Sequence, residues 1–407
     1  MSDYFPEDLM QKIFLRLPVK SLIKSTAVCK SWMSLIKSST FIQSHLLSTI
    51  DSNYKNDTHL ILQSASSYSV RDRRIHHHHC LRWDSPEFSE YSKLLNPVVV
   101  NRNRNLSVVG TCNGLVCLQS DTSFHSDRSP TLLWNPSIRK IVILPSPPTS
   151  FTSDDHYLKF TTHGFGYDSH SGDYKILRIV TLIDPDSDSD SDSSGDFEVQ
   201  VYSLARGCWK SLIVLLLSVK IWSLVILKHM LILSMVLFIF LKHVCVWFIV
   251  IRMNSLNLGG DNFITSFNLA TELFGQVMMP QALGKDRCFL SRYGESLALI
   301  KYKDDWEPPS GCHLWVMKEY GVAESWTFLF NIAMVEVQVY GFKRSGEVVL
   351  MEINLHAERR MISLDPKSNQ VKVFGTEDYK YYFMDSFVES LVLLDHANAM
   401  SVRGGRN

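Results

Sequence analysis

Apolar and polar residues near the N-terminus alternate with the spacing of short helices. Within residues 5–17, Leu9, Ile13 and Leu17 recur at every fourth position and form one stripe along a helix. Pro6 suits the start of that helix, where its missing N–H would have no partner in any case. The pattern predicts a first helix whose apolar face is wider than so short a helix can bury by itself.

Pro18 ends this helix and starts the next one, because it lacks a donor and clashes with the preceding turn. Apolar residues continue at helical spacing through residues 19–36, in two further short segments. Three helices within about 40 residues form a unit that is too small to rely on its own core. We therefore expect a partner or a neighbouring domain to cover part of its apolar surface.

From about residue 106 the apolar positions form short extended runs that are separated by turn residues, which is typical of an all-β domain. Asn113-Gly114 is a strong hairpin signal between two such runs. Similar paired runs recur around landmark residues that lie 33, 35, 65, 48 and 49 positions apart, namely Trp134, Tyr167, Tyr202, Phe267, Trp315 and Leu364. Periods of about 40 to 50 residues predict propeller blades, and the 65-residue step is an anomaly.

Residues 212–251 interrupt this pattern with a long apolar run that lacks Asp, Glu, Asn, Gln, Gly and Pro. A membrane hairpin or anchor is one interpretation, and a buried helical insert is another. A single span would put the strands on either side of it on opposite sides of a membrane, and the run has no turn residue for a second span. We prefer a third interpretation, a misread frame or a retained intron that distorts one or two blades.

Composition and charge narrow the classes of function. The chain has 41 basic and 41 acidic residues, so its net charge gives no reason to expect a nucleic acid or an anionic membrane as partner. Its eight cysteines show no Cys-x-x-Cys spacing of a zinc site or of a disulfide framework. No secretory signal opens the sequence. These features predict a protein of the cytoplasm or nucleus, with no metal and no cofactor.

The N-terminal segment resembles the F-box family. The resemblance rests on the order Phe-Pro-Glu-Asp-Leu, then Ile, Leu-Pro, Leu, Val-Cys-Lys, Trp and Leu-Ile at F-box spacing. It implies docking on the Skp-type adaptor of an SCF, or cullin-RING, ubiquitin ligase. Nine residues would carry or support the docking face: Pro6, Leu9, Ile13, Leu17, Pro18, Leu22, Val28, Cys29 and Trp32. The alternative for each is a place in the core of the three helices, and the Cys29 thiol is predicted to be packed within a helical run rather than catalytic.

The β region is similar to the F-box-associated domain, which is often described as kelch-related. The phrases "LLWNPSIRK", "GFGYDSHSGDYKILR", "FNLATELFGQV" and "ESWTFLF" carry this resemblance, whereas the Gly-Gly pair of a strict kelch blade is missing. The resemblance implies a surface of loops that binds a target protein. The tryptophans at strand positions are predicted to pack in the core, and the number of blades stays open.

Two further segments are unusual. Residues 184–196 alternate serine with aspartate and contain no apolar side chain, so they predict a solvated loop, with an acidic or phosphorylated docking loop as the alternative. Residues 74–80 contain four adjacent histidines. Side chains that alternate in direction along an extended segment do not converge on one metal ion, so no metal site is predicted there.

The predicted fold class is α+β by domains, with a small N-terminal three-helix F-box followed by an all-β, propeller-like domain of short antiparallel sheets. The predicted boundaries are 1–45 for the F-box, 46–105 for a linker and first strands, 106–395 for the β domain, interrupted at 212–254, and 396–407 for a disordered tail.

The predicted function is that of a non-catalytic substrate receptor of an SCF ubiquitin ligase. Its partners would be a Skp-type adaptor, through it a cullin, and a target protein, with no nucleic acid. Two alternatives stay open. One is an inactive, pseudogene-derived chain with a disrupted β domain, and the other is an enzyme on a propeller scaffold.

Overall fold

A computed structural model gives the structure of the chain in fifteen ranges. The residues that it describes are 6–69, 74–95, 97, 105–121, 130–148, 158–183, 197–212, 238–241, 244–247, 263–283, 288–302, 311–334, 337–353, 359–376 and 381–402. The chain divides into two compact units. The first combines residues 1–121, 129–144 and 379–407, and the second combines 122–128 with 145–378.

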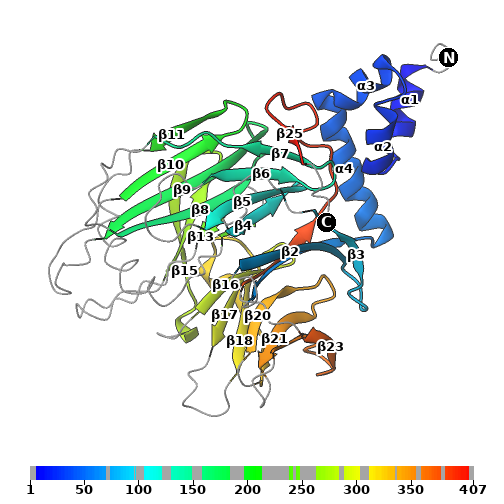
Figure 1. Ribbon diagram of the computed structural model, residues 1–407. Coiled ribbons are helices and arrows are strands. Elements are labelled where there is room, and N and C mark those ends of the chain that lie inside the picture. The colour runs from blue at the N-terminus through cyan, green and yellow to red at the C-terminus, as the bar shows by residue number, and fades with distance from the viewer. Residues whose placement is uncertain are drawn as a thin grey trace. The chain divides into compact units, whose positions relative to one another are not determined.

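Four α-helices lie in the described part of the first unit (Figure 1). They are α1 (Glu7–Phe14), α2 (Val19–Ser25), α3 (Lys30–Lys37) and α4 (Ser39–Asn56). Pro6 and Pro18 directly precede α1 and α2, because a proline ring fixes an extended entry into the helix and removes a donor that would be unpaired there. Helix α1 ends at Phe14, three residues earlier than the pattern predicts.

Helix α4 was not predicted, and it crosses the boundary placed at residue 45. It starts where the Ser38 hydroxyl accepts a hydrogen bond from the Phe41 backbone N–H at 3.3 Å, as an N-cap does. It ends at Asp57, which has a left-handed φ of 53°. The helical unit is therefore longer than the three helices that the apolar spacing indicates.

Two antiparallel sheets complete the first unit, with the strand orders β24-β1-β2-β3 and β25-β7-β6-β5-β4. Their strands are β1 (Leu60–Ser69), β2 (Arg74–Trp83), β3 (Glu90–Lys93), β4 (Asn105–Cys112), β5 (Leu115–Asp121), β6 (Thr131–Asn135), β7 (Lys140–Ile143), β24 (Tyr381–Phe387) and β25 (Met400–Ser401). Strands from both ends of the chain therefore share each sheet, and Leu60 pairs with Phe387.

The C-terminal segment is ordered further than the sequence predicts. Met400 pairs with Ile141, and the Val402 N–H donates to the carbonyl of Arg139 at 2.8 Å. The disordered tail predicted from residue 396 thus differs from the structure as far as Val402, because these residues extend a sheet edge. Residues 403–407 lie outside the described residues.

One apolar core joins the two sheets of the first unit. It combines side chains from the first strands, such as Leu62, with Trp134 of β6 and Phe383 of β24. Trp134 is 1% exposed, which confirms the prediction that this tryptophan packs in the core. Asn135 follows it and is fully buried, and its amide donates to the carbonyls of Ser390 at 3.0 Å and Val392 at 2.8 Å. The turn after β6 thereby holds the C-terminal segment in place.

The hairpin predicted at Asn113-Gly114 joins β4 to β5. Both residues have positive φ, 51° and 79°, as a two-residue turn of this kind requires. A Cβ at Gly114 would collide with the Val388 carbonyl and the Ser390 side chain. Glycine is needed here for its backbone conformation and for the close approach of the C-terminal segment.

The second unit contains four antiparallel sheets of four strands each among its described residues, in the orders β11-β10-β9-β8, β12-β13-β14-β15, β16-β17-β18-β19 and β20-β21-β22-β23. The strands of the first two are β8 (Leu158–Asp168), β9 (Asp173–Ile183), β10 (Phe197–Ser203), β11 (Cys208–Leu212), β12 (Phe238–Leu241), β13 (Val244–Trp247), β14 (Phe263–Asn268) and β15 (Leu273–Met278).

The remaining strands are β16 (Cys288–Tyr293), β17 (Ser296–Tyr302), β18 (Cys312–Met317), β19 (Trp326–Ile332), β20 (Val337–Phe342), β21 (Val348–Ile353), β22 (Arg359–Leu364) and β23 (Val371–Thr376), with short 3₁₀ helices at Gln281–Leu283 and Ala323–Ser325. The first strand of each sheet lies next to the first strand of the following sheet, in the sequence β8, β12, β16, β20. Small sheets that adjoin through their first strands are the blades of a propeller, which confirms the predicted fold class.

The long apolar run contains strands. Within residues 212–254, β12 and β13 pair with each other, and β13 pairs with β14. The described part of the run is thus extended, which differs from a helical insert or a membrane helix at these positions. Residues 213–237, 242–243 and 248–254 of this run lie outside the described residues, and the interpretation as a gene-model error stays a prediction. Within the described ranges, no helix has the length and apolar character to cross a membrane.

A five-residue turn recurs between strands of both units. In each copy the first residue is Asn, Asp or Ser, and its side-chain oxygen accepts a hydrogen bond from a backbone N–H two or three residues later. The fifth residue has a positive φ. The first residues are Asn135, Asp168, Ser203, Asn268 and Asp365, and the fifth are Arg139, Gly172, Gly207, Glu272 and Asn369.

These turns correct the predicted blade spacing. Trp134, Tyr202 and Phe267 each lie on the third strand of a sheet, whereas Tyr167 lies on β8, the first strand of the sheet that also contains Tyr202. The two short steps of 33 and 35 residues therefore belong to one blade-to-blade step. The steps between the landmark residues on third strands are then 68, 65, 48 and 49 residues, so the 65-residue step is one of two long steps.

His163 is buried in the sheet that begins with β8. Its side chain is 7% exposed, and its Nδ1 has no hydrogen-bond partner in the described part of the chain. Burial, followed by the positive charge of Arg178, lowers the pKa of His163 to about 3. Arg178 pairs with His163 across β8 and β9, and its guanidinium donates to the Gln200 side-chain oxygen at 2.6 Å. The folded chain thus holds His163 neutral where the unfolded chain would protonate it.

Acid is expected to destabilise the second unit through His163. Below pH 6.5, the ordinary pKa of histidine, His163 is protonated in the unfolded state but stays neutral in the folded state. The free energy of unfolding therefore falls as the pH drops from about 6.5 towards 3. At pH 5 the loss from this group amounts to about 2 kcal/mol. Urea unfolding at pH 7 and pH 5 measures it, and His163→Gln should show a correspondingly smaller loss. The exposed His170 supplies the control, and an equal effect of His170→Gln would contradict the assignment.

Candidate functional site

Helix α1 has one buried and one exposed apolar side. Phe14 is 2% exposed, and its ring lies 5.0 Å from Trp32 on α3 and 6.5 Å from Phe41 on α4, edge to face in both cases. Leu9 and Ile13 lie on the other side, and each is 43% exposed. Packing of Phe14 thus orients α1 so that its Leu9–Ile13 stripe faces outward.

The nine predicted docking residues divide into three groups by exposure. Pro6, Leu9, Ile13, Pro18 and Val28 are exposed, and Leu17, Cys29 and Trp32 are half-buried. Leu22 is fully buried and belongs to the interior of the helices. The five exposed residues are therefore accessible to a partner, whereas Leu22 can only support the helices from their interior.

Met33 is an exposed apolar residue outside the predicted docking set. It lies on α3 directly after Trp32 and is 37% exposed. Its neighbours Lys30, Ser34 and Lys37 are polar and exposed, so no apolar stripe indicates it. The large exposed hydrophobic side chains in the first 38 positions that the structure describes are then Leu9, Ile13, Val28 and Met33, and we term these four residues the apolar face.

Helix α4 holds the turn that follows α1 through side-chain hydrogen bonds. The buried His45 lies with Nε2 2.8 Å from the Leu17 carbonyl, and the Ser48 hydroxyl donates to the Leu15 carbonyl at 3.3 Å. Burial lowers the pKa of His45, and the bond to Leu17 offsets part of this effect. The turn after α1 is therefore held by hydrogen bonds to its carbonyls rather than by its own short helix.

Cys29 lies at a helix end rather than within a helical run. It is the N-cap residue of α3 with an extended backbone, and its Sγ lies 3.1 Å from the Ser31 hydroxyl. The hydrogen bond with Ser31, followed by the Trp32 backbone N–H, lowers the pKa of the thiol. The prediction of a thiol packed within a helix is therefore wrong in its placement, because residues 26–29 form the turn between α2 and α3.

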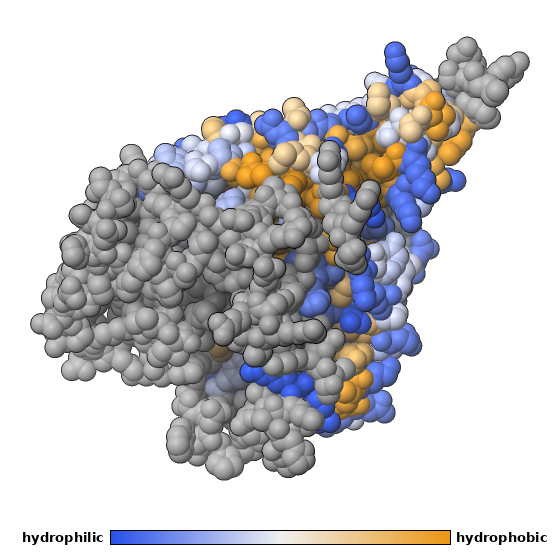
Figure 2. Space-filling model, viewed as in Figure 1, coloured by the Kyte–Doolittle hydropathy of each residue, from blue (hydrophilic) through white to orange (hydrophobic). Residues whose placement is uncertain are grey.

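The surface over these helices combines apolar and charged side chains. Figure 2 shows hydrophobic side chains, in orange, interspersed with hydrophilic ones, in blue, over the helical part of the first unit at the upper right. Apolar side chains bordered by polar ones are common in protein–protein interfaces.

The adjacent histidines lie on different sides of β2. His78 is exposed, whereas His79 is 4% exposed and packs edge to face against Trp134 at 5.5 Å. Among the described residues, no group of three His, Cys, Asp or Glu side chains is arranged to hold a metal ion. Residues 184–196, the alternative docking loop, lie outside the described residues.

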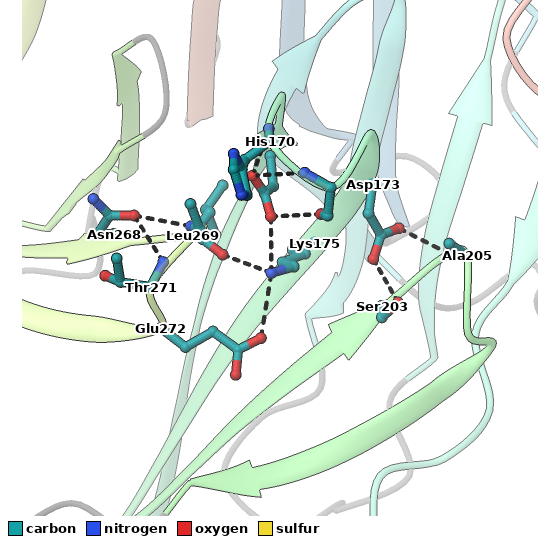
Figure 3. Close-up of polar contacts among 12 residues, drawn as sticks. His170, Asp173, Lys175, Ser203, Ala205, Asn268, Leu269, Thr271 and Glu272 are labelled. Carbon is teal, nitrogen blue, oxygen red and sulfur yellow. Dashed lines mark hydrogen bonds and ion pairs between the residues drawn. The ribbon is translucent and has the colours of Figure 1, made fainter.

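A charged cluster in the second unit joins two blades (Figure 3). Lys175 is 7% exposed, and its Nζ donates to the Leu269 carbonyl at 2.6 Å, lies 3.1 Å from Asp168 Oδ2 and lies 3.3 Å from Glu272 Oε1. Asp168 comes from the turn between β8 and β9, whereas Leu269 and Glu272 come from the turn between β14 and β15. Burial raises the pKa of Asp168, but hydrogen bonds from Ser171 and Lys175 outweigh it and bring the pKa to about 2.

Carboxylates with shifted pKa values are candidates for catalytic groups, so this cluster bears on the alternative that the chain is an enzyme. The Lys175 ammonium has three hydrogens, and three acceptors from two turns surround it. The exposed Lys210 adds a second cation at 2.7 Å from Glu272 Oε2. A lysine surrounded in this way fastens one blade to the next, and we assign the cluster a structural role.

Comparison with known proteins agrees with both parts of the fold. Residues 65–394 match the family described as the F-box associated beta propeller domain, and residues 3–44 match the F-box domain. The F-box protein CPR1 of Arabidopsis thaliana is 28% identical over 422 aligned residues, which cover 95% of this chain and 88% of that protein. The F-box/kelch-repeat protein At3g23880 of the same plant is 28% identical over 80% of this chain and 79% of its own.

Solved structures resemble the chain only distantly. A fucose-specific lectin from Aleuria aurantia aligns over 77% of this chain and 90% of its own, with a TM-score of 0.38 and 7% identity, and supports no inference about function. The family match spans most of the chain and agrees with the small antiparallel sheets and the N-terminal helices. This chain is therefore a member of the family of F-box proteins that carry an F-box associated beta propeller domain.

Proposed function

We propose that this chain is the substrate-recognition subunit of an SCF ubiquitin ligase. The observation that carries the proposal is the apolar face on helices that match the F-box domain. Leu9 and Ile13 are each 43% exposed on a helix whose opposite side is buried, so they are available to a Skp-type adaptor. Through that adaptor the chain would join a cullin.

The β domain would hold the target protein. Rigid four-stranded sheets with connections of different lengths and sequences are well suited to recognition, because the sheets fix the positions of the loops that vary. In this arrangement the chain contributes no catalytic residue, and ubiquitin is transferred by other subunits.

Reconstitution tests the proposal directly. The full chain is expected to form a stable complex with a purified plant Skp-type adaptor, measurable by titration calorimetry, and to enter a complex with cullin only when the adaptor is present. Cross-linking and mass spectrometry on plant extracts would then identify proteins that bind the chain and are ubiquitinated by the reconstituted ligase. A properly folded chain that binds no Skp-type adaptor would contradict the proposal.

A further inference from the structure

The helices that carry the apolar face have an excess of positive charge, although α1 begins with the two carboxylates Glu7 and Asp8. Between Asp8 and Asp51 the sequence contains six Lys or Arg residues and no Asp or Glu, although the whole chain is balanced at 41 of each sign. The six are Lys12, Arg16, Lys20, Lys24, Lys30 and Lys37, and all are exposed. The excess of positive charge is therefore local to this surface.

Four of these cations border the apolar face by helical spacing. Lys12 follows Leu9 by three positions, and Arg16 follows Ile13 by three positions in the turn that ends α1. Lys30 and Lys37 lie three positions before and four positions after Met33 on α3. Residues three or four apart are neighbours on a helix surface. We term these four cations, Lys12, Arg16, Lys30 and Lys37, the cationic rim.

The cationic rim is not neutralised within the parts of the chain that the structure describes. No side chain in the described ranges forms a hydrogen bond or ion pair with any of these four residues. By contrast, the exposed Lys55 on α4 pairs with Asp51 at 2.6 Å. Like charges next to exposed apolar side chains raise the local potential and favour a partner of the opposite sign.

We propose that the adaptor surface that covers the apolar face is rimmed by carboxylates, and that the cationic rim steers the adaptor to the F-box helices. This inference rests on the proposed function and adds to it the charge of the partner and the step that the charge controls. Charges at the rim of an interface act mainly on the rate of association, whereas the buried apolar centre sets the rate of dissociation. Added salt should therefore weaken the affinity for the adaptor mainly by lowering the rate of association.

Stopped-flow or surface-plasmon kinetics of the full chain with a purified Skp-type adaptor test this. Lys12→Glu with Arg16→Glu, and separately Lys30→Glu with Lys37→Glu, should each slow association by about tenfold or more at low salt. Dissociation should change by less than about threefold, and the difference should largely disappear near 1 M salt, where the screening length is about 3 Å. Lys55→Glu with Lys93→Glu makes the same change in net charge away from the apolar face and should leave association close to wild type.

The outcomes separate this inference from the function on which it rests. Rim variants that associate at the wild-type rate in low salt would overturn the steering proposal while leaving adaptor docking intact. So would a loss confined to dissociation, or a loss of binding to phosphatidylserine vesicles with unchanged adaptor kinetics, which would assign the rim to a membrane surface. If the wild-type chain binds no adaptor, both the function and this inference fail.

Discussion

Leu9→Asp and, separately, Ile13→Asp should each weaken adaptor binding by at least about 2 kcal/mol, roughly 30-fold in Kd, and together should abolish it. Each change removes an aliphatic side chain that the adaptor would bury and puts an unpaired carboxylate at the centre of the contact. Because both side chains are 43% exposed in the free chain, the fold itself should tolerate the substitutions. Titration calorimetry with the Skp-type adaptor measures the loss.

The controls for this prediction are a matched surface position and a measure of folding. Leu273 lies on β15 and is 66% exposed, so Leu273→Asp makes the same chemical change far along the chain from the helices and should leave adaptor affinity unchanged. Circular dichroism should show unaltered thermal unfolding for all three variants. Leu9→Asp and Ile13→Asp proteins that stay folded and bind as tightly as wild type would remove the docking role of α1.

Lys175→Met should destabilise the second unit by about 3 to 5 kcal/mol. The substitution keeps most of the side-chain volume but removes the cation that lies between Asp168 and Glu272, and it leaves the Leu269 carbonyl without its donor. Asp168 loses one of the hydrogen bonds that hold its pKa near 2, so a buried carboxylate is left partly uncompensated. Urea unfolding at neutral pH, followed by tryptophan fluorescence, measures the change.

Lys210→Met is the matched control for this cluster. Lys210 binds the same carboxylate of Glu272 at 2.7 Å, but its side chain is 59% exposed, so its loss should cost no more than about 1 kcal/mol. Adding Asp168→Asn to Lys175→Met should recover part of the stability, because the second change removes the charge that the first leaves unpaired. Equal losses for Lys175→Met and Lys210→Met would show that burial does not strengthen this cluster.

The strands and hairpins could be predicted because local signals agree with the final fold. Asn113-Gly114 specifies its turn by itself, and it is flanked by two apolar runs that are rich in strand-forming residues. Pro6 and Pro18 mark helix starts in the same local way. Where one or two residues fix the backbone, the sequence is sufficient to indicate the element.

The fourth helix could not be predicted, because tertiary contacts define its buried side. Helix α4 buries His45 beside Phe41, Ile42 and Leu46, and the histidine is there to bind the Leu17 carbonyl. A polar residue at a core position interrupts the apolar stripe on which the prediction relied. The contact that explains it joins residues 28 positions apart.

The blade spacing was misjudged for a related reason. The recurring turn follows the first strand of one sheet at Asp168–Gly172 and its third strand at Ser203–Gly207, so the same local signal occurs twice within one blade. Sequence alone therefore makes Tyr167 and Tyr202 look equivalent, although they lie on the first and third strands of one sheet. The sequence also does not predict which docking residues are exposed. Leu9 and Leu22 occupy the same kind of apolar helical position, but Leu9 is exposed and Leu22 is buried.

The pairing of β24 with β1 has a consequence for how the protein is made. Strand β1 leaves the ribosome early, but its neighbour Tyr381–Phe387 is among the last segments to be synthesised. One edge of the first sheet therefore stays unpaired while more than three hundred intervening residues are synthesised. Pairing between strands so far apart in sequence is also slow to form. Nascent chains of this protein are thus expected to depend on chaperones until termination of translation, and a premature stop codon before Tyr381 would leave that edge permanently open to aggregation.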